Sequence, residues 1–551
     1  MNLYKYVSDA INKKLGFNAS LEVPKNRDFG DFATNAAMVG AKAAGKNPRE
    51  LANEILPQLQ ELDFVDNVSV AGPGFINIKI KDKFILDNAT IPEHIATEKI
   101  LNLDLDYGSY NIGKALHIGH LRPTVVGDTF NRIATFIGHK IKSYNHIGDW
   151  GRPMGLIIAW ILEYGMPTNA DELNEIYPKS SARAKEDEKW LNKARKITSE
   201  LQSGNQELLD IYNKFIPMSL KQMDKILIRL NVKSFNATMG EHSMSEYVPE
   251  ITRILENKKL IQESDGALIV NIRNESDNAP MPPLMIQNSA NAQTYDAWDL
   301  SAIYYRNETD NPYEIIYFTD SRQTLHFQQL FRVAKMANLT DAKLTHIGFG
   351  TITGKDGKPF KTRDGNVAGL SDILNMVEAA VRERVAESNK QLNSQTINQI
   401  ALSAVKFNDL IHDIKSDYIF DTDTITSFEG RTGPYVLYTA VRLNSVLKRA
   451  NTNIAKPVSY KLSNDERNVL IQIMDFEHMI LSAFENCAPD LLANYTYDLC
   501  QLANNFYHNC PILRDDVPTE IKAGRLYITK MAFDTLSTAI NLMGLQIPEE
   551  M

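Results

Sequence analysis

The chain has 551 residues, an ordinary apolar fraction of 43% and a formal net charge of −9. This length allows three or four domains of about 150 residues each. No apolar run reaches the roughly 18 residues that a membrane-spanning helix needs, which argues against a helical membrane protein. The acidic balance argues against a generic nucleic-acid-binding surface, but it leaves open a selective RNA contact through a local basic face.

The first residues and the cysteines predict a cytoplasmic protein. Residues 1–17 alternate apolar and charged side chains and contain no apolar core of a secretion signal. Cys487, Cys500 and Cys510 are odd in number and fit no zinc-binding spacing. We therefore expect them to be reduced thiols in a protein core.

Residues 1–95 are predicted to form a small N-terminal α+β domain. Helical patterns over 3–15 and 48–59 flank short extended segments. The run Gly72-Pro73-Gly74 predicts a turn, and the alternation over 75–78 predicts the strand that follows it.

Residues 96–390 show the alternation of strands and helices that is typical of an α/β domain. The predicted strands cover 103–107, 141–145, 314–319 and 344–349. The stretch from about 155 to 285 differs, because it is polar, rich in Lys and Glu, helical over 171–230 and hairpin-like around 267–272. We expect an insertion here that splits a nucleotide-binding fold.

Residues 391–551 are predicted to form an all-α helical bundle. Apolar residues recur at helical spacing over 396–410, 433–450, 464–476, 491–510 and 527–544. The segment 511–519, between the last two of these, is predicted to be an exposed loop.

The most informative motif lies in the segment 111–122, which contains His117-Ile118-Gly119-His120 between a predicted strand and a predicted helix. A helix N-terminus directs backbone N–H groups and the positive end of its dipole toward an anion. The imidazoles of His117 and His120 can donate hydrogen bonds to phosphate oxygens, and Lys114 adds a cation three residues upstream. The combination predicts a phosphate site.

A second candidate is the basic loop 354–363, where Lys355, Lys358, Lys361 and Arg363 accompany two glycines. A flexible basic loop can close over polyphosphate and neutralise the charge that develops on leaving pyrophosphate. A solvated hairpin tip is the alternative interpretation, and the histidine motif favours the functional one.

Eight segments in chain order carry a common resemblance. They are 29–35, 72–77, 111–122, 145–151, 320–327, 357–363, 428–436 and 495–510. Together they resemble the arginyl-tRNA synthetases, a family of the class I aminoacyl-tRNA synthetases, over nearly the whole chain. The resemblance implies an α/β, Rossmann-type catalytic core with a helical insertion, an N-terminal tRNA-contacting domain and a C-terminal anticodon-binding bundle.

The resemblance also implies activation of L-arginine by ATP and transfer to the 2′-hydroxyl of the terminal adenosine of arginine tRNA. The implied catalytic residues are Lys114, His117, His120, Lys358, Lys361 and Arg363. The implied ATP site contains Gly113, His117, Gly119, His120 and Lys361. The basic loop lacks a strict Lys-Met-Ser-Lys, so it stays open which lysine neutralises pyrophosphate. Mg²⁺ is implied only as part of the ATP complex, and no metal site is predicted.

The family's arginine-binding residues correspond here to Asp106, Asn111, Tyr295, Asp299 and Gln323. A guanidinium is a planar fork of donors that carboxylates at fixed angles bind best. Asn111 is expected at the α-amino end of the substrate.

We expect arginine tRNA, L-arginine and ATP as partners, no DNA, no membrane and, by default, a monomer. Three alternatives stay in view. A small-molecule nucleotidylyltransferase is disfavoured by the C-terminal bundle, and a tRNA-binding paralogue without efficient charging is disfavoured by the intact histidine motif and basic loop. A different class I specificity is disfavoured by Asp106, Tyr295 and Asp299.

Overall fold

The computed structural model describes residues 3–24, 29–274, 277, 281–358, 360, 368–388, 391–457 and 461–551. Contacts divide the chain into two compact units. The first unit contains Met1–Ile95, Asn389–Ile411 and Thr426–Met551, and the second contains Ala96–Ser388 and His412–Ile425. The N-terminal domain therefore clusters with the C-terminal bundle. The segment 412–425, which the sequence-based division places in the bundle, clusters with the α/β domain.

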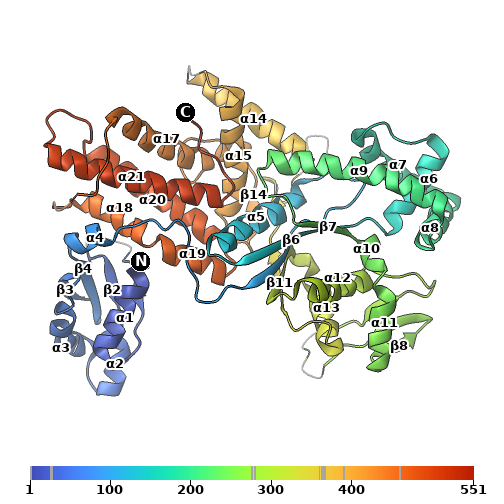
Figure 1. The fold of residues 1–551 in the computed structure, drawn as a ribbon, viewed down its shortest axis with the longest axis horizontal. Coiled ribbons are helices and arrows are strands. Elements are labelled where there is room, and N and C mark those ends of the chain that lie inside the picture. Colours follow the sequence, from blue (N-terminus) through green and yellow to red (C-terminus); the bar gives the residue numbers. More distant parts are fainter. Residues whose placement is uncertain are drawn as a thin grey trace. The chain divides into compact units, whose positions relative to one another are not determined.

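The N-terminal domain is an antiparallel sheet with helices, as the sequence predicts (Figure 1). The strand order is β1 (Leu21–Glu22), β2 (Phe32–Thr34), β4 (Phe75–Ile80) and β3 (Val65–Ala71). The helices are α1 (Leu3–Leu15), α2 (Ala36–Ala44), α3 (Pro48–Gln60) and α4 (Asp82–Asn88). Asn47 begins α3 by accepting a hydrogen bond from the N–H of Arg49, and Pro48 fits the first helical position because it has no N–H to leave unpaired.

In the described residues the C-terminal region is helical, as predicted, apart from the short strand β14 (Tyr418–Ile419), and it appears in orange to red in Figure 1. Its main helices are α15 (Ser394–Leu410), α17 (Gly433–Ala450), α18 (Asn464–Met474), α19 (Phe476–Glu485), α20 (Pro489–Asn509) and α21 (Thr519–Leu542). The predicted helix 464–476 runs past the end of α18, since the structure breaks at Asp475 and α19 begins at Phe476. The prediction missed this break because the apolar spacing continues across it. α21 begins earlier than predicted, because its first two turns are largely polar.

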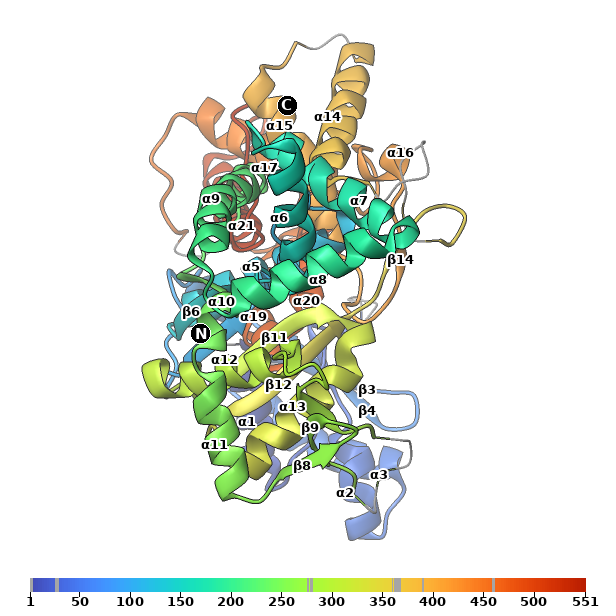
Figure 2. The same ribbon diagram turned by 90° about the vertical axis from the view of Figure 1, so that its right-hand side faces the viewer.

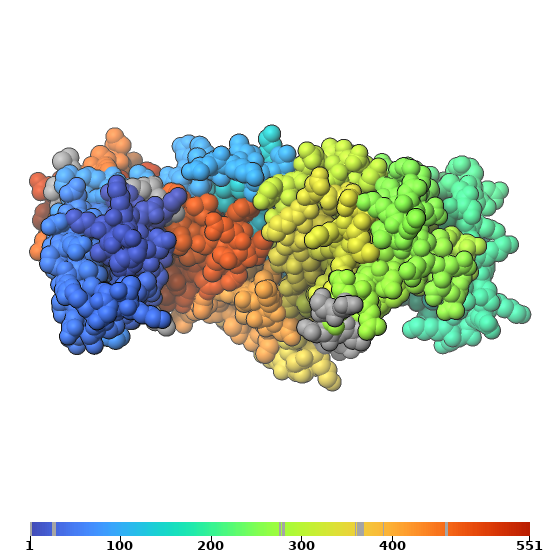
Figure 3. Space-filling model, turned by 90° about the horizontal axis from the view of Figure 1, so that it is seen from below, coloured from blue at the N-terminus to red at the C-terminus, as the bar shows by residue number. Residues whose placement is uncertain are grey.

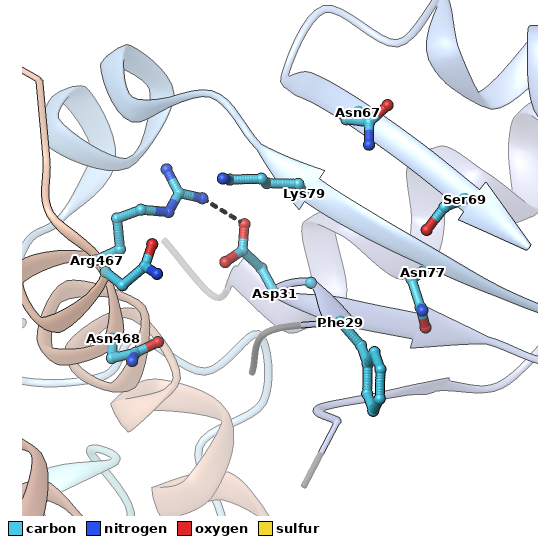
Figure 4. A pocket seen from close by; sticks show the side chains of 10 residues that line it. Phe29, Asp31, Asn67, Ser69, Asn77, Lys79, Arg467 and Asn468 are labelled. Carbon is cyan, nitrogen blue, oxygen red and sulfur yellow. Dashed lines mark hydrogen bonds and ion pairs between the residues drawn. The ribbon is translucent and has the colours of Figure 1, made fainter. Parts of the chain in front are cut away.

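Arg467 of α18 joins the bundle to the N-terminal domain. Its Nη2 lies 2.7 Å from Oδ2 of Asp31 and 2.8 Å from the carbonyl oxygen of Ile80, and its Nη1 contacts Asp82. Arg467 and Asp31 are only 4% and 5% exposed. The surfaces of the two parts adjoin in Figure 3, and Figure 4 shows the ion pair as a dashed line.

Replacing Arg467 with alanine is expected to destabilise the protein by about 3–5 kcal/mol, because the buried Asp31 carboxylate would lose its guanidinium partner. The measurement is urea-induced unfolding. The matched control is Arg514→Ala. Arg514 pairs with Asp516, and their side chains are 66% and 64% exposed, so the loss of unfolding free energy should stay below about 1 kcal/mol. Equal losses in the two variants would contradict the assignment.

The second unit is built on a five-stranded parallel sheet in the order β12-β11-β5-β6-β7. The strands are β5 (Asn102–Asp106), β6 (Lys140–Ile147), β7 (Ala237–Gly240), β11 (Glu314–Asp320) and β12 (Lys343–Phe349). Four of them match the predicted strands. The chain runs outward from β5 to β6 and β7, and then continues on the other side of β5 with β11 and β12. The carboxyl ends of β5 and β11 therefore flank the crevice where sheets of this type bind ligands.

Four helices leave the sheet after β6 and pack against one another (Figure 2). They are α6 (Arg152–Tyr164), α7 (Ala170–Glu186), α8 (Glu188–Gln202) and α9 (Gln206–Arg229). The chain then returns to the sheet at β7, so a core strand interrupts the single insertion expected over 155–285. β7 is too short to show a strand pattern in the sequence.

A second excursion from the sheet follows β7. It contains α10 (Glu241–Ser245), α11 (Val248–Asn257) and a small antiparallel sheet of β8 (Ile261–Ser264), β9 (Ala267–Val270) and β10 (Leu284–Gln287). The predicted hairpin around 267–272 lies in this small sheet. The excursion leads into α12 (Tyr295–Asp310), which precedes β11.

The remaining elements of the second unit come after β5, β11 or β12 in the sequence. They are α5 (Leu121–Phe136), η3 (Ser321–Gln323), α13 (Thr324–Ala337), β13 (Ile352–Thr353), α14 (Leu370–Glu387), β14 (Tyr418–Ile419) and α16 (Thr422–Ile425). Within the described ranges, no helix is long and apolar enough to cross a membrane. The three cysteines are free thiols, and Cys500 and Cys510 are buried.

Candidate active site

The histidine motif forms a short 3₁₀ helix, η2 (Ile118–His120), in the loop between β5 and α5. His117 precedes this turn, and its Nδ1 accepts a hydrogen bond of 3.1 Å from the N–H of Gly119. Nδ1 of His120 accepts a hydrogen bond of 3.1 Å from the N–H of His117. The rings stack with their centroids 4.0 Å apart, so the backbone fixes both imidazoles.

Both imidazoles are neutral and carry their proton on Nε2. Burial and the charge of Lys114 lower the pKa of His117. Burial, with help from the charges of His117 and Lys114, lowers the pKa of His120 to about 3. Because Nδ1 of each ring accepts a backbone N–H, the one proton of the neutral ring lies on Nε2. The motif thus holds two imidazoles that can donate through Nε2, and of the two only His117 lines the cavity described below.

The chain beyond the basic loop contacts the histidine motif, because His117 forms an antiparallel bridge with Gly369, six residues after Arg363. Lys358 is exposed in the turn at the start of the loop. Lys361 and Arg363 lie outside the described residues, so their predicted roles rest on the sequence alone.

Arg122 ties α5 to the strand that leads into the basic loop. It is 1% exposed, and its Nη1 donates to the carbonyl oxygens of Gly350 at 2.9 Å and Ser416 at 2.7 Å. The histidine motif and the base of the loop therefore share one buried anchor.

A cavity of about 200 Å³ lies between the two motifs. Its lining residues are His117, Ile118, Gly119, Arg122, Asp320, Arg322, Phe349, Gly350, Thr351, Ile352 and Phe360. Arg322 was not predicted, although it lies in the segment 320–327 that contributes to the resemblance. Asp320 holds its guanidinium at 2.6 Å, and the side chain of Arg322 is still 80% exposed. It is a further cation for an anionic ligand of this cavity.

Helices of the insertion pack on the start of the motif. The N–H of Gly113 donates to Oγ of Ser219 in α9 at 3.1 Å. Gly113 has a φ of +69°, and a Cβ at this position would lie 2.4 Å from Cδ1 of Ile157, so a side chain does not fit. Nζ of Lys114 lies 4.4 Å from the ring centre of Tyr177 in α7, in a cation–π contact. The insertion therefore helps to position this loop.

A larger cavity, of about 430 Å³, lies beside Asn111. Its size is that of a small-molecule site. Its lining residues include Asn111, Arg152, Gln202, Glu241, Gln293, Tyr295 and Trp298. Two of the predicted arginine-binding residues, Asn111 and Tyr295, thus meet at one cavity. Tyr295 is 60% exposed, so its ring is accessible to a ligand.

Glu241, at the start of α10, is a functional candidate that the sequence did not reveal. Its carboxylate accepts a hydrogen bond of 3.1 Å from the N–H of Trp150. Burial, together with the charges of Asp149 and Asp299, raises its pKa to about 8 against the opposing effect of that hydrogen bond. Burial disfavours the charged form of Glu241, and a ligand cation beside it would favour that form. No motif surrounds Glu241, so only the fold identifies it.

Asp106 lies away from solvent and against a guanidinium of the protein itself. It is 3% exposed, and its Oδ2 lies 2.5 Å from Nη2 of Arg306 in α12. The Arg306 guanidinium stacks 4.2 Å from the ring centre of Tyr144. This geometry favours a supporting role for Asp106 over the direct substrate contact that the sequence predicted.

Neither Asp299 nor Gln323 lines the larger cavity, although Asp299 is close enough to act electrostatically on Glu241. Oδ2 of Asp299 accepts a hydrogen bond of 2.7 Å from Nε2 of His326 in α13, and Oδ1 lies 3.7 Å from Nε2 of His146. The Asp299 side chain is 28% exposed, so a ligand can still reach it. Gln323 is exposed in η3, directly after β11.

A parallel sheet with a histidine motif at its switch point and a basic loop beside it defines a class I aminoacyl-tRNA synthetase catalytic domain. Residues 84–422 match the family described as tRNA synthetases class I (R), catalytic domain. Residues 1–80 match the arginyl tRNA synthetase N terminal domain, and residues 436–551 match the DALR anticodon binding domain.

Relatives and solved structures that span the whole chain give the same result. The arginine–tRNA ligase of Alkaliphilus oremlandii is 34% identical over 98% of this chain and 96% of its own, and that of Hyphomonas neptunium is 35% identical over 95% and 94%. The arginyl-tRNA synthetase structure from Plasmodium falciparum covers 100% of this chain and 98% of its own at 25% identity with a TM-score of 0.82. The structure from Thermus thermophilus covers 100% of both chains at 23% identity with a TM-score of 0.85, and supports the fold.

The chain therefore belongs to the arginyl-tRNA synthetase family. This confirms the predicted family and the predicted fold class. Full-length similarity to arginine–tRNA ligases leaves no support for a nucleotidylyltransferase or for another class I specificity.

Proposed function

We propose that this protein activates L-arginine with ATP and then esterifies the 2′-hydroxyl of the terminal adenosine of arginine tRNA. One observation carries the proposal. The loop from Asn111 to His120 contributes to both cavities, with a histidine donor at one and the amide of Asn111 at the other. A loop that borders an anion cavity and an amino-acid-sized cavity can align the two reactants, and alignment supplies most of the catalysis in phosphoryl-group chemistry of this kind.

In the first step, a carboxylate oxygen of arginine bonds to the α-phosphorus of ATP as the bond to pyrophosphate breaks. Nε2–H groups of His117 and His120 donate to phosphate oxygens and stabilise the charge that shifts toward the leaving group. Lys114, Lys358, Lys361 and Arg363 are proposed to neutralise the phosphates. Mg²⁺ is proposed to arrive with ATP, since the described residues hold no cluster of three or more His, Cys, Asp or Glu that could bind a metal ion.

The substrate guanidinium is proposed to meet carboxylates at the edge of the larger cavity. Asp299 is the predicted partner, and Glu241 is the one the cavity adds. Tyr295 is proposed to contact the side chain of arginine and Asn111 its α-amino end. Gln323 is proposed as a further substrate contact, and Asp106 is proposed to support the site through Arg306.

The tRNA is proposed to contact both parts of the first unit, the bundle at the anticodon and the N-terminal domain elsewhere. A polar pocket of about 300 Å³ at the domain junction supports this (Figure 4). Asn67, Asn77 and Lys79 line it from β3 and β4 together with the ring of Phe29. A ring for stacking and amides for hydrogen bonds suit an unstacked nucleotide base. We also propose a cytoplasmic monomer that binds neither DNA nor membranes.

The decisive test is arginine-dependent exchange of pyrophosphate into ATP, with and without arginine tRNA. The expected result is exchange that needs arginine and appears only with tRNA, because the family resemblance implies that tRNA binding precedes activation. Folded protein that binds tRNA but supports no exchange would instead favour the paralogue that does not charge tRNA efficiently.

A further inference from the structure

His326 lies between two carboxylates of one helix face. Asp296 and Asp299 are three residues apart on α12 and so point to the same side. Nε2 of His326 lies 2.7 Å from Oδ2 of Asp299, and Nδ1 lies 3.2 Å from Oδ1 of Asp296. An ionised carboxylate can only accept hydrogen bonds, so an unprotonated ring nitrogen at either distance would face a lone pair. The Nε2 contact is a hydrogen bond and the Nδ1 contact is an ion pair by distance without hydrogen-bond geometry, and two carboxylates beside one ring favour the doubly protonated imidazolium.

The groups around this ring favour the same charge state. Burial lowers the pKa of His326, but the hydrogen bonds and charges of Asp296 and Asp299 outweigh burial and raise it to about 10. His346 of β12 also faces this site, and burial and the His326 charge lower its pKa to about 4, so it adds no second cation. Tyr295 of α12 contributes a ring 5.3 Å from His326. The charge of Asp320, at the end of β11, opposes this effect and raises the pKa of His346.

We propose that His326 is a positioning residue for arginine selection: its imidazolium fixes the Asp299 carboxylate and leaves one net negative charge for a single substrate guanidinium. This rests on the proposed function, in which Asp299 receives that guanidinium. His326 holds Oδ2 of Asp299, and Nε2 of His146 lies 3.7 Å from Oδ1, beyond hydrogen-bond distance, so Oδ1 can still accept from the ligand. A carboxylate fixed before binding loses less conformational freedom when the ligand arrives.

The charge arithmetic explains why an imidazolium is needed here. Asp296 and Asp299 carry two negative charges, and one protonated His326 leaves a net charge of about −1 for this cluster. Arginine supplies one positive charge in its side chain. A neutral residue at position 326 would leave two carboxylates repelling each other, and Asp299 would be free to rotate away from its binding orientation.

Two variants test the proposal with the full-length enzyme and arginine tRNA, by pyrophosphate exchange. His326→Gln should raise the KM for arginine about 10- to 100-fold, the scale seen when a partner behind a ligand-binding group is lost, with the KM for ATP unchanged. Asp296→Asn keeps an acceptor but removes a charge, so the pKa of His326 falls toward the range from about pH 6.5 to 8.5. The ring then loses its proton as the pH rises through that window.

The sign of the pH effect is therefore fixed. In Asp296→Asn the cluster carries no net charge while His326 is protonated and one negative charge once the ring loses its proton, so the KM for arginine should fall as the pH rises between about 6.5 and 8.5, whereas the wild-type KM should stay level there. A purely structural role for Asp296 would lower activity without this pH dependence. Thermal unfolding of each variant identifies any that fails to fold, and Asp296→Asn keeps the test open if His326→Gln does.

Asp299→Asn separates this inference from the proposed function. If Asp299→Asn raises the KM for arginine while His326→Gln and Asp296→Asn leave it unchanged at every pH, the positioning role is wrong and the function stands. If wild-type exchange does not depend on arginine, both are wrong.

Discussion

Replacing His120 with alanine is expected to slow arginine-dependent pyrophosphate exchange by about 10²–10³, the cost of removing one preorganised donor to developing charge. The effect should fall on kcat, because a donor aimed at the leaving pyrophosphate acts mainly in the transition state. The loss is expected to be almost independent of pH between about 6 and 9, because the pKa of His120 lies near 3 and the ring is neutral throughout.

The side chain of glutamine provides the matched control for His120. Its amide nitrogen lies about where Nε2 of a histidine lies, so His120→Gln should recover part of the rate that alanine loses, while neither variant changes the KM for arginine. Alanine also removes the acceptor for the N–H of His117, so the thermal unfolding of both variants must be compared. Equal rates for alanine and wild type would remove His120 from the phosphate site.

Strand β11 was predictable because its middle, residues 315–318, is a continuous apolar run. β11 is buried along nearly its whole length, and such a run between turns predicts a strand of a covered parallel sheet. β7 escaped prediction, because four residues at the edge of the sheet carry no pattern of their own. Its pairing with β6 depends on the insertion bringing the chain back, which local spacing does not record.

The histidine motif was predictable for a different reason: its ligand-binding groups come from consecutive residues. The ion pair between Asp106 and Arg306 joins positions 200 apart, and nothing near either residue indicates the other. The family resemblance assigns Asp106 to the substrate, and only the fold reveals that Arg306 is its partner. Glu241 shows the reverse case, since an ordinary acidic residue becomes a candidate only when the cavity beside it is known.

Replacing Asp299 with asparagine is expected to lower kcat/KM for arginine by roughly 30- to 5,000-fold, the equivalent of the 2–5 kcal/mol lost when one partner of a desolvated charge pair is truncated. Asparagine keeps the size of the side chain but replaces one acceptor oxygen with a donor and removes the charge. The 28% exposure of Asp299 places the loss toward the lower end of that range, because solvent screens a half-open site.

The same variant decides which carboxylate the guanidinium meets. The measurement is the KM for arginine in Asp299→Asn and in Glu241→Gln, with the KM for ATP as the internal control. A large loss in Asp299→Asn supports the residue that the sequence predicted. If Asp299→Asn binds arginine normally and Glu241→Gln does not, the guanidinium lies deeper, against the buried carboxylate of the larger cavity. A loss in both would mean that the two carboxylates share the planar fork, one on each edge, as the geometry of a guanidinium allows.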